Sequence, residues 1–287
     1  MHKLLLRNVS DMTNLWELYK NGTWVEPFLS LSIDLFVGAS FLLYLLIIWS
    51  RYKNIKKEKL QKQYSIVIEK AIFSIIFQDI SFSEIQQDKE YAALAKNSFF
   101  REVLTETLIN LHKNYEGAYA QKLEEFYQQA GLMDKSLKKL KNLKWEIKCK
   151  GISELAEMNV TEAFEGILNV SKSRNKTLKI TALNACIKLA GVKGITHLSS
   201  HPFPIDEWTQ VNIIHAFKKH DIGDTKGVEL LLHSQNTTIV SLGLKIIKEL
   251  RLTQKASYVA DLAVAPPNAL IQYEAQNVLK ELTAQTI

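Results

Sequence analysis

The chain has 287 residues, of which 47% are hydrophobic and 23% are charged, and its formal net charge is +6. This composition excludes a disordered tail and is sufficient for a sizeable core or an extended repeat array. Only 11 Gly and 5 Pro interrupt the chain, so an almost entirely helical, all-α fold is predicted. The two cysteines, Cys149 and Cys186, lie outside any CxxC or Cys/His cluster, which indicates a reducing compartment without disulfides or structural zinc.

The first predicted element is a transmembrane helix over residues 29–50, preceded by a short extracytoplasmic segment, residues 1–28. The window 28–49 contains no Lys or Arg, a single acid, and 14 Phe, Leu, Ile or Val residues. Each of these contributes about −0.3 to −0.6 kcal/mol to insertion, against a cost below about 3 kcal/mol for an Asp away from the centre. A cleavable signal peptide is the competing interpretation. The apolar run is too long for one and ends in basic residues instead of small ones.

A basic collar follows the span and predicts its orientation. Residues 51–62 hold six Lys or Arg against one Glu, whereas residues 1–28 carry three of each sign. The positive-inside rule therefore places the C-terminal part in the cytoplasm, most simply beneath a bacterial inner membrane. The predicted aromatic belts are Trp24 on the outer side and Tyr44, Trp49 and Tyr52 on the inner side. The collar residues expected to contact anionic lipid headgroups are Arg51, Lys53, Lys56 and Lys57.

Ser30, Asp34 and Gly38 form a small and polar stripe at i, i+4 and i+8 within the span. One interpretation is that this stripe packs against another membrane helix, where the carboxyl group finds a donor. The other interpretation is an acid within two turns of the outer interface that simply contacts water.

Residues 51–143 are predicted to form the collar, a helical stalk and adaptor helices. No Gly or Pro occurs from Ala39 to Tyr115, so the membrane helix is expected to continue as a stalk. Two further helices are predicted over 89–113 and 116–130 from apolar residues three and four apart. Gly117 and Gly131 are expected near the ends of these helices.

From residue 144 to 287 the sequence repeats itself. The segments that align are "IKCKGISEL" (147–155), "LKITALNAC" (178–186), "TQVNIIHAF" (209–217), "IVSLGLKII" (239–247) and "IQYEAQNVL" (271–279). Their fifth residue, here called the small-residue position, is Gly151, Ala182, Ile213, Gly243 and Ala275, at spacings of 31, 31, 30 and 32. Shorter apolar helices lie between the segments, and a period near 31 predicts a stacked array of helix pairs. Ile213 departs from the preference for a small residue.

The segment "LKITALNACIKLAG" (178–191) resembles HEAT repeats, particularly the short ones found in the phycobilisome-lyase-like group. The resemblance covers residues 144–287 well and 90–131 loosely. It implies an α-solenoid that binds a protein along one helical face. The lyase members act on bilins, but no matching His or Cys arrangement occurs in this chain. The layout also resembles bacterial membrane-anchored HEAT-repeat proteins, some of which accompany exopolysaccharide glycosyltransferases.

The sequence contains no recognisable catalytic motif. The phosphate-binding loop, the dinucleotide fingerprint, the serine-hydrolase elbow and the zincin helix all lack their residues. His197 and His201 stand four apart, but no third ligand lies nearby in sequence and Pro202 follows directly, so a solvated turn is favoured over a metal site. Neither an enzymatic activity, a cofactor nor a small-molecule substrate is therefore expected.

A second basic stretch, residues 134–150, has three interpretations. Residues 135–150 carry a net charge of +6 and the collar 51–62 carries +5, which leaves −4 for the remainder of 51–287. Lys138, Lys139, Lys141 and Lys144 are candidates for contact with anionic lipid. A solvated helix face and a nucleic-acid site are the alternatives, and the scarcity of Arg and of aromatic residues disfavours nucleic acid.

Together these features predict a membrane-anchored, non-catalytic cytoplasmic scaffold or adaptor. Its partner is expected to be a protein already at the membrane, such as a membrane enzyme or assembly, because anchoring raises the effective concentration of the repeats there. The alternatives are a divergent lyase-like or metal-binding HEAT protein, and a basic repeat array that binds nucleic acid.

Overall fold

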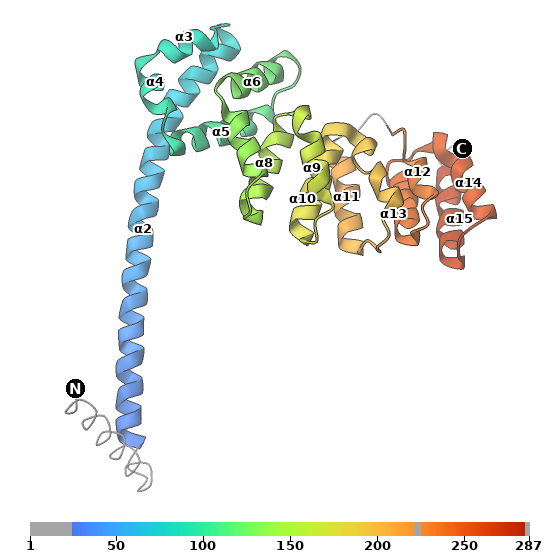
Figure 1. Cartoon of the computed structure of the whole chain (residues 1–287), viewed down its shortest axis with the longest axis horizontal. Helices are drawn as coiled ribbons and strands as arrows, with labels where there is room; N and C mark the ends of the chain where they lie inside the picture. The colour runs from blue at the N-terminus through green and yellow to red at the C-terminus, as the bar shows by residue number, and fades with distance from the viewer. Residues whose placement is uncertain (1–24, 221–224, 285–287) are drawn as a thin grey trace. The chain divides into compact units, whose positions relative to one another are not determined.

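The computed structural model describes residues 25–220 and 225–284. All regular elements in these two ranges are helical and none is a strand, which confirms the predicted all-α class (Figure 1). The chain divides into two compact units, residues 1–64 and 65–287. The predicted extracytoplasmic segment, with Trp24, lies outside the described residues except for its last four positions.

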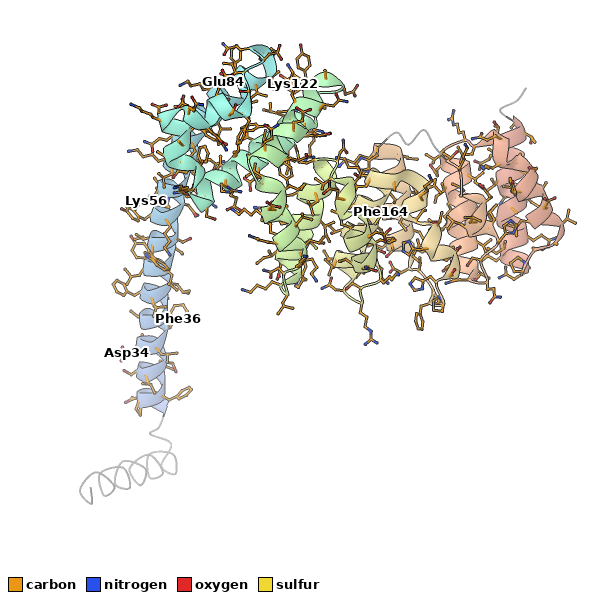
Figure 2. All side chains as sticks on the ribbon, turned by 45° about the horizontal axis from the view of Figure 1, so that its top comes forward. Asp34, Phe36, Lys56, Glu84, Lys122 and Phe164 are labelled. Carbon is orange, nitrogen blue, oxygen red and sulfur yellow. The ribbon has the colours of Figure 1, made fainter. Side chains whose placement is uncertain are left out.

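Helix α2 (Val25–Phe77) begins in the first unit, and its last 13 residues belong to the second. The side chains from Glu26 to Lys59 are all exposed, and Figure 2 shows Asp34, Phe36 and Lys56 projecting from the helix. The most apolar 18-residue window of α2 has a mean hydropathy of 2.3 and is not buried at any position. Among the described residues, α2 is therefore the one helix long and apolar enough to cross a membrane, and at 1.5 Å per residue the predicted span 29–50 alone is about 33 Å long.

The N-terminal part of the second unit packs around the last turns of α2. The helices here are α3 (Phe82–Gln87), α4 (Lys89–Ala95), α5 (Ser98–His112), α6 (Ala118–Gln129) and α7 (Leu132–Leu140). The predicted helix over 89–113 is thus two helices, because Asn97 caps α5 through hydrogen bonds from the amides of Phe99 and Phe100. Gly117 and Gly131 have φ values of 61° and 64° and precede α6 and α7, as the sequence indicated.

Helix pairs follow in chain order. They are α7 with α8 (Trp145–Glu157), α9 (Phe164–Ser171) with α10 (Lys176–Ala190), α12 (Glu229–Leu232) with α13 (Thr237–Glu249), and α14 (Ala256–Val264) with α15 (Ala269–Ala284). Between the second and third of these lies α11 (Glu207–Lys219), which is preceded by the two short 3-10 helices η2 (Gly191–Gly194) and η3 (Thr196–Ser200). The second helices α8, α10, α11, α13 and α15 pack successively against one another (Figure 1).

All five residues at the small-residue position are buried in second helices. A Cβ atom on Gly151 would lie 2.7–2.9 Å from atoms of α7, and one on Gly243 would lie 3.0 Å from two leucines of α12. The small residues therefore allow the two helices of a pair to approach closely. Ile213 is the exception because α11 has 3-10 turns instead of an α-helix as its pair, and it packs in the same core as Val192 and Ile195.

Two cap motifs recur with the same period. A side chain seven residues before the small-residue position caps the second helix by accepting a hydrogen bond from the backbone; these residues are Asn175, Asp206, Asn236 and Asn268. Eight residues after the same position, Asn159 and Arg251 end their helices with left-handed φ values of 50° and 53°. The backbone amide of the following residue then donates a hydrogen bond to a carbonyl oxygen in the last turns of the helix. The spacing of the small-residue position was thus enough to predict the repeat. The capping residues have the same spacing and would have supported the same prediction.

Candidate docking face on the second helices

The second helices pack successively against one another, and their exposed sides together form an extended surface of the second unit. We call it the second-helix face and define it by the positions two before, two after and six after the small-residue position. Its residues are Cys149, Ser153, Glu157, Ile180, Asn184, Lys188, Val211, His215, Lys219, Ser241, Lys245, Glu249, Tyr273, Asn277 and Glu281. All but Ser241 are partly or fully exposed. Residues four apart share one side of an α-helix, so each helix contributes one stripe to this face.

Charged side chains link neighbouring helices along the face. Lys188 Nζ on α10 lies 2.5 Å from Glu157 Oε2 on α8, and Lys248 Nζ on α13 lies 2.6 Å from Glu281 Oε1 on α15. Lys218 on α11 forms a further ion pair with Glu249 on α13. These pairs hold successive helices in register and leave the adjoining Lys219 exposed on α11.

A hollow of about 340 Å³ opens on the second-helix face between α8, α10 and α11. Asn184, Lys188, His215 and Lys219 are among its lining residues, and the buried Asn184 Oδ1 has no hydrogen-bond partner in the described part of the chain. Burial alone would raise the pKa of Glu157, but the hydrogen bond from Lys188 and the nearby positive charges hold it below the ordinary value. The hollow thus combines an ion pair, an unpaired amide oxygen and a further cation, which suits a polar and partly acidic protein segment.

The membrane stripe Ser30, Asp34 and Gly38 lies on exposed turns of α2 (Figure 2 labels Asp34). A Cβ atom on Gly38 would meet nothing within 4 Å, so the described residues leave room for close approach of another helix there. In the collar, Arg51, Lys53, Lys56 and Lys57 are also exposed. Lys53 Nζ lies 3.5 Å from the centre of the Trp49 ring, a cation–π arrangement at the inner end of the predicted span.

The four lysines of the second basic stretch are not equivalent. Lys138, Lys141 and Lys144 are exposed, and Leu143 beside them is 98% exposed, so these side chains are available to an anionic surface. Lys139 differs from the prediction, because its side chain is only 15% exposed and its ammonium lies 2.5 and 2.7 Å from the two carboxylate oxygens of buried Glu154. Lys139 is therefore engaged inside the fold and is removed from the lipid-contact set.

The two histidines considered as metal ligands make separate polar contacts. His197 Nε2 lies 3.1 Å from Ser171 Oγ, and His201 Nδ1 accepts a hydrogen bond from the Phe203 amide. No group of three or more His, Cys, Asp or Glu residues that could hold a metal ion occurs among the residues described. The pKa of His197 is lowered by burial and by the charge of Lys172, and that of His201 is lowered by burial and by Lys179.

We expect acid to destabilise the fold through His197. A histidine whose pKa is depressed in the native state takes up a proton more readily when unfolded, so its contribution to stability is complete above about pH 6.5 and declines as the pH falls below it. His197→Gln should therefore lose less thermal stability than the parent chain between pH 7 and pH 5. The control is His233→Gln, at an exposed position. Parallel melting profiles for the parent and His197→Gln across this interval would contradict the expectation.

Comparisons with known proteins identify no relative of this chain. Neither the family models, nor the curated proteins, nor the solved structures contain a match to the chain. Its fold and candidate sites are accordingly described from its own residues, and the HEAT resemblance stays a prediction.

Proposed function

We propose that the chain is a membrane-anchored, non-catalytic scaffold that binds a partner protein along the second-helix face. The observation that carries this proposal is the side-by-side packing of α8, α10, α11, α13 and α15, with matching positions that are exposed or partly exposed except at Ser241. Such an arrangement fits an α-solenoid of HEAT-like pairs. In repeat arrays of this kind the exposed residues vary freely while the stacked core stays the same.

The anchor in this proposal is the α2 segment 29–50, which crosses the membrane once. The basic collar supports a cytoplasmic location for residues 51–287 and an external location for residues 1–28, as in a bacterial inner membrane. Arg51, Lys53, Lys56 and Lys57 then contact anionic headgroups, and exposed Lys138, Lys141 and Lys144 offer a second basic surface. A membrane enzyme or assembly is the favoured class of partner, because both molecules share one surface.

The stripe of Ser30, Asp34 and Gly38 offers a second contact with the same partner, within the bilayer. An isolated carboxyl group in hydrocarbon is costly, so a donor on a neighbouring helix would stabilise Asp34 there. Loss of the partner on Asp34→Leu would support this intramembrane contact, and retention would assign binding to the second-helix face alone.

The test is photo-crosslinking of the full chain in intact membranes, with a photoreactive residue in place of exposed Val211 or Tyr273. We expect one membrane protein to be captured from both positions. Lys219→Glu should reduce its yield about tenfold, because charge reversal in a contact region costs on the order of 1–2 kcal/mol or more. The matched control is Lys193→Glu, an exposed lysine of η2 away from the second-helix face.

Other outcomes distinguish the alternatives. Capture of nucleic acid alone, released by salt, would replace the scaffold by a nucleic-acid-binding array. Equal capture by Lys219→Glu and the parent chain would remove the second-helix face as the contact surface. Stoichiometric metal in the purified protein, lost in His197→Ala, would support a metal-binding HEAT protein instead.

A further inference from the structure

A second hollow, which shares no lining residue with the second-helix face, lies between α3, α4, α5 and the turn that joins α6 to α7. Its volume is about 360 Å³. At about 30 Å³ for each water-sized group, this volume accommodates on the order of twelve non-hydrogen atoms. The hollow is thus of the size of a small organic molecule.

The walls are partly apolar and partly polar. They include the side chains of Phe82, Phe100, Leu104 and Leu132, of which the last three are at most 1% exposed. The ring centres of Tyr91 and Phe100 lie 5.7 Å apart in an edge-to-face arrangement, which fixes the phenol ring. A hydrocarbon group placed here would contact ordered core side chains instead of water.

The Tyr91 hydroxyl is a donor without an acceptor. Tyr91 is 3% exposed and lines the hollow, yet its hydroxyl makes no hydrogen bond in the part of the chain that the structure describes. The hydroxyl oxygen is not fully enclosed by the protein, so it borders open space. Buried hydroxyl groups are normally hydrogen-bonded, so either a water molecule or a ligand atom in the hollow accepts from this one.

Two cations line the same hollow. Arg101 Nη2 donates to the Gly131 carbonyl oxygen at 2.6 Å, and neither Arg101 nor exposed Lys96 forms an ion pair with an acid within the described ranges. Burial raises the pKa of Tyr91 to about 12 even though the Arg101 charge lowers it, so the phenol keeps its proton at neutral pH. Gln86, whose side-chain amide both donates and accepts, also lines the hollow. The two cations, which have no acid partner in the described ranges, and the Tyr91 hydroxyl together favour an anion.

We propose that this hollow binds an amphiphilic carboxylate, a small molecule with a hydrocarbon body of about ten carbons and one carboxylate group. The body packs against Phe82, Phe100 and Leu132, and the carboxylate accepts hydrogen bonds from Tyr91, Arg101 and Lys96. A carboxylate suits this set because the guanidinium fork pairs with its two oxygens. This ligand site goes beyond the proposed scaffold and does not depend on it.

The test is calorimetric titration of the full chain in nanodiscs of a zwitterionic lipid. The probes are 4-phenylbutanoate, which has twelve non-hydrogen atoms by its formula, and its neutral isostere 4-phenylbutanamide. We expect saturable binding of the carboxylate with a dissociation constant of about 1 mM or tighter, and binding of the amide at least about tenfold weaker. Empty nanodiscs correct for partition of the probe into lipid.

Three variants separate binding from folding. Tyr91→Phe should weaken carboxylate binding about tenfold without lowering thermal stability, because its hydroxyl has no partner in the fold. Arg101→Gln should weaken it more, and Lys89→Gln, an exposed lysine of α4 outside the hollow, should leave it unchanged. The proposal is overturned if neither probe saturates, if the amide binds as tightly as the carboxylate, or if Tyr91→Phe retains the parent affinity.

Discussion

Replacing Glu154 with leucine is expected to lower the free energy of unfolding by about 3–5 kcal/mol, because it leaves a largely buried ammonium group without its counter-ion. The Glu154 carboxylate is 4% exposed and accepts hydrogen bonds from Lys139 and from Ser136 Oγ at 2.5 Å. Ser136 in turn accepts a hydrogen bond from the hydroxyl group of Tyr127 at 2.8 Å. The network joins α6, α7 and α8 near Gly151, where α7 and α8 approach closely.

Chemical denaturation of the full chain in detergent, followed by circular dichroism, measures this effect. The double variant Lys139→Met with Glu154→Leu should be more stable than the sum of the single losses predicts, since an uncharged pair leaves no unpaired charge behind. Glu281→Leu is the matched control, because its ion pair with Lys248 is well exposed and should contribute at most about 1 kcal/mol. A Glu154→Leu loss no larger than that of Glu281→Leu would show that the buried network is not stabilising.

Placing arginine at both Phe36 and Leu43 is expected to prevent insertion of α2 into a membrane. Each arginine near the centre of a span costs about 2.5–3.5 kcal/mol and also removes a favourable apolar side chain, so the pair costs about 6–8 kcal/mol. The 14 apolar residues of the window 28–49 contribute about −4 to −8 kcal/mol in total, which the two substitutions offset. The variant should leave the membrane fraction on alkaline extraction, whereas the parent chain stays in it.

The control for this experiment is Ile55→Arg, which adds a positive charge to the exposed collar beyond the span. It should remain in the membrane fraction, because basic residues at the inner end of a span favour insertion. If the double arginine variant resists alkaline extraction as the parent does, α2 is not the anchor.

The helical class and the repeat spacing were predictable because both depend on local patterns. Five residues near 31 apart predicted positions that are all buried, and the long run without Gly or Pro predicted one helix through the collar. The break at Asn97 was less visible, since a single side chain that caps the next helix divides an otherwise continuous apolar pattern. The first helix α12 has only four residues, because Ser234 and Asn236 turn the chain directly after it.

The candidate sites were less predictable because they depend on contacts between distant residues. Lys139 looked like its exposed neighbours, and only the packing of α7 on α8 places it beside Glu154, 15 residues away. The hollow at Tyr91 combines residues from four parts of the chain, none of which belongs to a spaced motif. Whether the Tyr91 hydroxyl has a hydrogen-bond partner depends on the folded structure and cannot be read from the sequence. The expectation that the chain has no small-molecule substrate was therefore made without this observation.

The 3-10 turns before α11 have a consequence for how the second unit responds to stress. A chain of neighbouring repeats owes its cooperativity to the coupling between adjacent units, and the weakest coupling decides where that cooperativity ends. The preceding pair has an α-helix of eight residues, α9, as its first helix, whereas η2 and η3 are 3-10 helices of four and five residues. We therefore expect local opening of the repeats to begin at these short 3-10 helices, within the continuous core of buried side chains that extends from Leu183 to Leu282.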